Sequence, residues 1–91
     1  MTLTLLGRGY CHLCDEMRAA LAPLLVALGA TLVELDVDAD PGLEARWGDL
    51  VPVLLAGEPE SGAEICHFRL DPVRAAAALR GEPLAARTEI R

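Results

Sequence analysis

The spacing of hydrophobic residues changes along the chain and separates strands from helices. Residues 2–6 alternate Thr with Leu before a second Leu, which predicts a short strand with at least one buried face. Over residues 12–28, apolar side chains recur at spacings of four, three and four, as on one side of a helix: Met17, Leu21, Leu24 and Leu28. Gly29 is predicted to end this helix, and Pro23 inside it predicts a kink rather than a break.

Three further stretches have the patterns of strands. Residues 31–37 alternate apolar and acidic side chains, which predicts a strand near a sheet edge. Residues 51–56 are a continuous apolar run, which is typical of a strand covered on both faces in the centre of a sheet. Residues 63–68 follow a turn-forming loop and are predicted to return antiparallel. Alternation would place Ile65 and His67 on one face and Cys66 and Phe68 on the other.

Two Asp-Pro pairs, at positions 40–41 and 71–72, predict the starts of two more helices. The first helix is short, carries Trp47 and ends at Gly48, and the second covers residues 73–80. The predicted order is therefore β-α-β-α-β-β-α, an α/β fold in which a four-stranded mixed sheet carries helices on both faces. We expect one domain over residues 1–81 and a C-terminal tail over residues 82–91.

Composition restricts the classes of partner. The net charge of -6 argues against a nucleic-acid binder, because such a protein depends on clustered cations. All eight basic residues are arginine. The apolar stretch at the start of the chain is interrupted by Gly7, Arg8 and Gly9. It is therefore much shorter than a signal peptide or a membrane span. We therefore expect a cytoplasmic monomer without a membrane partner. An odd number of cysteines, three, fits a compartment in which any disulfide is transient.

Cys11 and Cys14 form a Cys-x-x-Cys pair where the first strand gives way to the first helix. A cysteine at a helix N-terminus faces unpaired backbone N–H groups and the positive end of the helix dipole, and both favour the thiolate. Cys11 is therefore the predicted nucleophile. Cys14 lies about one helical turn further in, close enough to form a disulfide with Cys11, and is the predicted resolving thiol.

The element order, the Cys-x-x-Cys pair and the Val51-Pro52 dipeptide at the start of the third strand resemble the thioredoxin-fold superfamily. Glutaredoxins are the most similar, in particular small glutaredoxin-like proteins with Cys-x-Leu-Cys, and the resemblance extends from Thr2 to about Arg80. It implies a cis peptide bond at Pro52 and a substrate-binding surface formed by Arg8, Tyr10, Val51 and Pro52. The backbone of Val51 would hydrogen-bond the bound peptide or glutathione.

The resemblance also implies that Arg8, three positions before the nucleophile, stabilises the thiolate and binds a glutathione carboxylate. The helix dipole supplies only about 0.3–1 kcal/mol, whereas lowering a thiol pKa by ~2 units takes ~2.7 kcal/mol. Arg8 and backbone donors would have to supply the rest. Asp15 and Glu16, as like charges near the sulfur, oppose the thiolate, so we expect a moderately lowered pKa for Cys11.

The predicted function is that of a thiol-disulfide oxidoreductase of glutaredoxin-like type, which reduces protein disulfides or glutathione mixed disulfides through Cys11 and Cys14. No permanently bound cofactor or metal is expected, and glutathione would be a co-substrate. The chain departs from ordinary glutaredoxins before its last helix, where residues 67–71 replace the Gly-Gly-x-Asp that grips glutathione. Asp71 could stand in for that acid, but a helix N-cap already explains it.

Two other functions remain open from the sequence. A metal or iron-sulfur module would use both cysteines of the pair, and a mononuclear zinc site would need two more ligands from Cys66, His67 or His12. A redox-inert domain that binds a partner would not need Cys11. We expect Cys66 to be a buried small hydrophobe, His12 to be a solvated residue, and Trp47 and Phe68 to pack in the core or hairpin.

Overall fold

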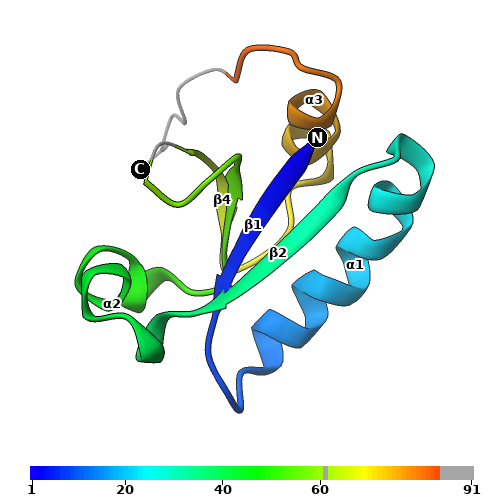
Figure 1. Ribbon diagram of the computed structural model, residues 1–91. Coiled ribbons are helices and arrows are strands. Elements are labelled where there is room, and N and C mark those ends of the chain that lie inside the picture. Colours follow the sequence, from blue (N-terminus) through cyan, green and yellow to red (C-terminus); the bar gives the residue numbers. More distant parts are fainter. Residues whose placement is uncertain (61, 85–91) are drawn as a thin grey trace, which may run out of the picture.

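The computed structural model describes residues 1–60 and 62–84 of the chain. Over those residues the predicted element order is confirmed, with short 3₁₀ turns before and after the second helix (Figure 1). The elements are β1 (Thr2–Gly7), α1 (His12–Leu28), β2 (Thr31–Asp36), η1 (Val37–Ala39), α2 (Pro41–Trp47), η2 (Gly48–Leu50), β3 (Val53–Ala56), β4 (Ala63–His67) and α3 (Pro72–Leu79). In this described part no helix is long and apolar enough to cross a membrane.

The strands lie in the order β2-β1-β3-β4, with β1 and β2 parallel and the β1/β3 and β3/β4 pairs antiparallel. The prediction of a mixed sheet with β2 at an edge is confirmed. The strand expected over residues 51–56 begins only at Val53. Val51 and Pro52 lie outside it, and a proline has no N–H group to donate to a neighbouring strand.

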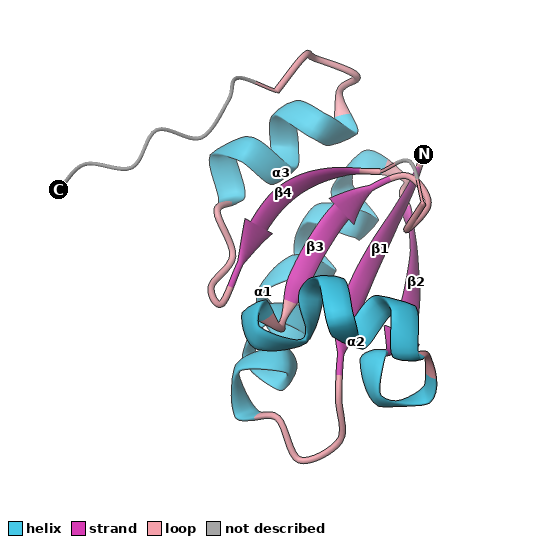
Figure 2. Ribbon diagram, turned by 90° about the vertical axis from the view of Figure 1, so that its left-hand side faces the viewer, coloured by secondary structure: helices cyan, strands magenta, loops and turns pink. Residues whose placement is uncertain are grey.

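Helices cover both faces of the sheet. Alternate residues of β1 point to opposite sides, so Leu5 packs with α1 and α3 while Leu6 packs with α2. Figure 1 shows α2 on one side of the sheet and α1 on the other, and Figure 2 shows the same layers turned by 90°. Trp47 of α2 is buried in the second of these clusters, as predicted. The core is thus two apolar layers separated by the sheet.

The helix α1 follows the predicted stripe over most of its length. Met17 and Leu21 are buried, but Leu28 is 40% exposed, so the prediction that it faces the core is wrong. Leu24, as predicted, and its neighbour Leu25 pack against the core, whereas Leu28 is the last residue of the helix. Gly29 ends it in the left-handed conformation with φ +64°, which glycine adopts without strain because it has no Cβ atom. The helix continues through Pro23.

A β-bulge alters the predicted faces of β4. Leu54 lies opposite Cys66 and Leu55 lies opposite Glu64, so Ile65 is the extra residue. Because of the bulge, Ile65 and Cys66 pack in the same core cluster, and the prediction that they face opposite sides is wrong. Phe68 lies beyond the strand and is 41% exposed, so it is not a core residue.

The helix α3 is tied to β4 by one arginine. Asp71 caps the helix by accepting a hydrogen bond from the backbone N–H of Arg74 at 3.1 Å. The side chain of Arg74 donates to the carbonyl of Ile65 through Nε at 2.7 Å and to that of Glu64 through Nη2 at 3.1 Å. The start of the predicted tail still contacts the core through Leu84, and residues 85–91 of that tail lie outside the described residues.

Candidate functional site

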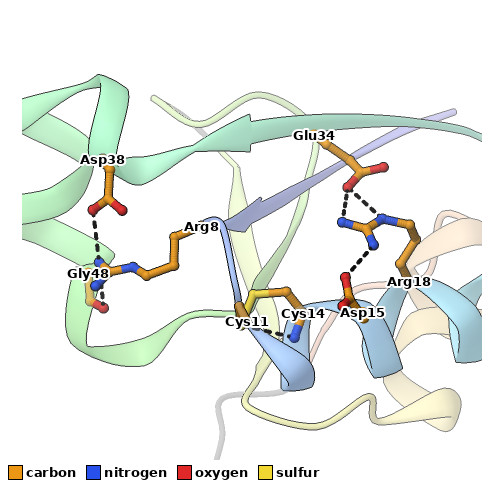
Figure 3. The surroundings of a disulfide bond; sticks show 8 residues. All are labelled: Arg8, Cys11, Cys14, Asp15, Arg18, Glu34, Asp38 and Gly48. Carbon is orange, nitrogen blue, oxygen red and sulfur yellow. Dashed lines mark hydrogen bonds and ion pairs between the residues drawn. A yellow bond between two sulfur atoms is a disulfide. The ribbon is translucent and has the colours of Figure 1, made fainter.

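Cys11 and Cys14 lie at the N-terminus of α1 and are joined by a disulfide, with their Cα atoms 5.2 Å apart (Figure 3). Cys11 is the N-cap residue, with extended backbone angles, and its sulfur accepts a hydrogen bond from the backbone N–H of Cys14 at 3.1 Å. The sulfur thus takes the place of the oxygen that usually caps a helix. A negative charge on this sulfur would be favoured by the same N–H group and by the helix dipole.

The two sulfurs differ in their access to solvent. Cys11 is partly exposed, whereas Cys14 is only 2% exposed. Gly7, the last residue of β1, lies directly against Cys14, because a Cβ atom at Gly7 would stand 3.0 Å from its sulfur. The sequence pattern predicts this glycine only as the end of a strand. Its contact with Cys14 could be predicted from its position, because a strand that passes closely beside the start of a helix needs a glycine there.

A cleft of about 220 Å³ opens on the Cys14 side of the disulfide, between the start of α1 and β2. Its lining includes Gly7, Cys14, Arg18, Glu34 and Asp36. Arg18 spans the cleft, because its guanidinium pairs with Asp15 at 2.8 Å and with Glu34 at 2.7 Å (Figure 3). The hydrogen bond to Asp15 and then that to Glu34 raise the pKa of Arg18 above its ordinary value. The negative charge of Asp15 beside the cysteines is therefore offset by a permanent cation.

The Val51–Pro52 peptide bond is cis, as the resemblance implied. Leu6 pairs with Val53, so one residue further along Gly7 of β1 lies opposite Pro52, at the same end of the sheet as the cysteines. Pro52 is buried, and its carbonyl accepts a hydrogen bond from the N–H of Phe68 at 2.9 Å. The side chain of Val51 packs against the α2 side of the core.

Two aromatic residues near the site have unusual backbones. Among the described residues, Tyr10 and Phe68 are the positions other than glycine with positive φ, at 58° and 65°. This conformation costs roughly 1–2 kcal/mol for an ordinary L-residue. Tyr10 immediately precedes Cys11 and its side chain is fully exposed. The ring of Phe68 packs edge-on against the His67 ring with their centroids 4.7 Å apart.

Arg8 does not point toward the sulfurs. Its guanidinium lies on the other side of the loop, where Nη2 contacts Glu44 at 2.6 Å, the Gly48 carbonyl at 3.3 Å and Asp38 at 3.5 Å. Figure 3 shows the side chain extending away from Cys11 toward Asp38 and Gly48. The predicted arginine is therefore beside the site, but its charge is directed at carboxylates rather than at a thiolate.

The residues considered as additional metal ligands are not grouped with the pair. Cys66 is buried in the core, and His67 hydrogen-bonds Glu64 at 2.9 Å. His12 is exposed, as expected. Within residues 1–60 and 62–84, no group of three or more histidine, cysteine or acidic side chains is placed to hold a metal ion.

The curated relatives that match this chain are uncharacterized proteins of mycobacteria. The chain is 39% identical over 72 residues to an uncharacterized protein of Mycobacterium tuberculosis, Rv0508. The match covers 72% of this chain and 74% of that protein. An uncharacterized protein of Mycobacterium bovis, Mb0520, matches with the same values.

Solved structures and a family model give the same fold. The solution structure of protein Ne2328 from Nitrosomonas europaea has a TM-score of 0.72 and 34% identity, and covers 84% of this chain and 87% of that one. Thioredoxin 1 from Thermosipho africanus has a TM-score of 0.60 and 17% identity, and the match covers 89% of this chain and 92% of that one. At this identity the similarity shows the fold alone. The family model described as Glutaredoxin-like domain (DUF836) matches residues 2–80, so this chain belongs to that glutaredoxin-like family, with a thioredoxin fold.

Proposed function

We propose that this protein is a thiol-disulfide oxidoreductase that reduces protein disulfides or glutathione mixed disulfides through Cys11 and Cys14. The observation that carries the proposal is the unequal exposure of two bonded sulfurs at a helix start. Cys11 is open to a substrate and caps the helix, whereas Cys14 is 2% exposed and lies within bonding reach of it. Such a pair attacks with the outer sulfur and resolves with the inner one.

The exchange has two steps. The Cys11 thiolate attacks one sulfur of the substrate disulfide, a bond forms between them, and the other substrate sulfur leaves as a thiolate that takes a proton from water. Cys14 then loses its proton and attacks the Cys11 sulfur, and the second substrate sulfur leaves in the same way. The substrate is reduced and the Cys11–Cys14 pair is oxidised. Glutathione, or another thiol reductant, acts as co-substrate and restores the dithiol.

Substrate contacts would come from groups around Cys11. Tyr10 projects fully into solvent next to the nucleophile, and Pro52 lies near the same end of the sheet, with Val51 preceding it. We assign these residues to the surface that receives the polypeptide or glutathione bound to the reacting sulfur.

The test is to equilibrate the protein in glutathione buffers of graded potential, quench with acid, alkylate, and map all three cysteines by peptide mass. We expect a reversible Cys11–Cys14 disulfide in the wild type and glutathionylated Cys11 in a Cys14→Ser variant. The matched control is Cys66→Ala, because Cys66 is also a cysteine but lies 1% exposed in the core. It should leave the Cys11–Cys14 equilibrium unchanged.

The opposite outcome is equally clear. If Cys11 and Cys14 stay reduced and unmodified across the whole series, the oxidoreductase proposal is wrong. A partner-binding or metal-binding role would then be favoured, and an absorption spectrum of freshly purified protein would reveal an iron-sulfur cluster, because such a cluster absorbs visible light.

A further inference from the structure

The contacts of Arg8 connect two segments that the proposed reaction needs together. Arg8 lies in the loop that leads from β1 to Cys11. Its partners Glu44 and Gly48 lie in α2 and at the start of η2, the turn that leads directly into Val51 and Pro52. One side chain therefore joins the loop of the nucleophile to the segment that carries the cis-proline.

The contact is built into the second segment. Glu44 approaches Gly48 so closely that any Cβ atom at position 48 would collide with the Glu44 carboxylate. The glycine therefore leaves room for the carboxylate that binds Arg8 at 2.6 Å, and its own carbonyl accepts a second hydrogen bond from the same Nη2 atom at 3.3 Å. A guanidinium held by a carboxylate and a carbonyl is fixed in orientation as well as in charge.

The same contacts weaken Arg8 as a source of positive potential for a thiolate. Glu44 and Asp38 place two negative charges at 2.6 Å and 3.5 Å from its Nη2 atom. Their potential opposes that of the guanidinium at any point further away, including Cys11. The side chain is also only 34% exposed, so it is restrained rather than free to swing toward a substrate.

We propose that Arg8 is a positioning residue, which holds residues 48–52 against the Cys11 loop so that a disulfide substrate meets the cysteine and the cis-proline in one fixed arrangement. This inference rests on the proposed oxidoreductase function. Without Arg8, binding a substrate must also order the segment before Pro52, and that cost reduces the apparent affinity. The effect falls on substrate binding more than on the chemistry of Cys11.

The test compares Arg8→Met, Arg8→Lys and Glu44→Gln with the wild type in steady-state reduction of a glutathionylated peptide. We expect Arg8→Met to lower kcat/KM about tenfold, mostly through KM. Arg8→Lys should recover part of the loss, because a lysine can still pair with Glu44. In the double variant, Glu44→Gln should add little to Arg8→Met, because the two residues act through one contact. Arg80→Met removes the same charge at the far end of α3 and is the control.

A second readout separates positioning from thiolate stabilisation. The pH dependence of alkylation of reduced Cys11 should keep its midpoint within about 0.5 pH unit in Arg8→Met, whereas loss of a stabilising cation would raise it by about 1 unit or more. Glu44→Gln is informative in the opposite sense. If Arg8 acted on the thiolate, removing its carboxylate partner would free its charge and lower the midpoint.

The inference is overturned by a raised midpoint in Arg8→Met, or by an unchanged KM in both Arg8→Met and Glu44→Gln. If Arg8→Met does not fold, Glu44→Gln tests the same contact, because Glu44 is exposed and its substitution removes the negative charge that pairs with Arg8. Failure of the proposed function is recognised separately, because the wild type would then show no exchange at all.

Discussion

The parallel half of the molecule, β1-α1-β2, and the antiparallel half, β3-β4-α3, are built by different means. In the first half, regular alternation and one helical stripe place nearly every buried side chain. The second half contains the cis peptide bond at Pro52, the bulge at Ile65 and the left-handed backbone of Phe68. The candidate site lies where the two halves meet, at the ends of β1 and β3.

This difference shows how the site is assembled. The parallel half supplies the reactive groups, because a strand that ends at Gly7 and a helix that begins after Cys11 bring the sulfurs to one place. The antiparallel half supplies the surroundings, through Pro52 and the loop that hydrogen-bonds it at Phe68. The parallel half therefore positions the two sulfurs, and the antiparallel half contributes part of their surroundings.

The largest expected effect tests the stripe of the parallel half. Leu21→Ala should lower the free energy of unfolding by about 2–5 kcal/mol, because Leu21 is 0% exposed and its removal leaves a cavity between α1 and the sheet. Urea unfolding, with the midpoint compared at constant m-value, measures the loss.

Leu28→Ala is the matched control, since it deletes the same atoms from the same helix. At 40% exposure it should lower the free energy of unfolding by less than about 1 kcal/mol. Equal losses in the two variants would show that the packed stripe continues to the end of α1, contrary to the structure.

The next effect concerns the start of α3 in the antiparallel half. Asp71→Ala removes the acceptor for the N–H of Arg74 and should lower the free energy of unfolding by about 0.5–2 kcal/mol. Asp71→Asn keeps a capping oxygen and should recover most of this loss. If both variants are equally unstable, the charge of Asp71 rather than its hydrogen bond stabilises the helix. Thermal unfolding of the three proteins distinguishes the two cases.

A smaller effect compares the strained residue of each half. Tyr10→Asn should raise the free energy of unfolding by about 0.5–1 kcal/mol, because asparagine tolerates positive φ and the exposed Tyr10 ring contributes little burial. Phe68→Asn should gain less, because it also loses the edge contact with His67, which is of order 0.5–1.5 kcal/mol. Denaturant unfolding measures both. A loss of stability in Tyr10→Asn would mean that the Tyr10 ring makes a stabilising contact.

The smallest effect lies beyond α3, where Arg80 hydrogen-bonds Glu82 at 2.6 Å. That hydrogen bond, with the charge of Arg80, lowers the pKa of Glu82 below its usual value of 4.5. The contribution to stability is therefore present above pH 4.5 and is lost as the pH falls through the lowered pKa. A carboxyl NMR titration should show the lowered pKa in the wild type and a value nearer 4.5 in Arg80→Met. An identical titration in both proteins would contradict the pairing.

The sequence predicts the fold well because its strands and helices bury residues with regular periods. It also predicts that Cys11 and Cys14 lie at the start of α1 within reach of a disulfide, and, through the family resemblance, that the peptide bond at Pro52 is cis. It does not reveal the bulge, because the insertion of Ile65 leaves the apolar composition of β4 unchanged. Nor does it show where Arg8 points, since Glu44 lies 36 residues away and the two meet only after α2 folds over the sheet.

The link between Arg74 and β4 lies on a strand at the edge of the sheet. As the terminal strand of the sheet, β4 has one side that no other described strand covers, and such edges readily pair with strands of another molecule. Arg74 occupies the carbonyl groups of Glu64 and Ile65 from α3, and the bulge twists the strand at the same place. Two carbonyl groups of this edge strand are therefore already hydrogen-bonded within the molecule, by a side chain of α3.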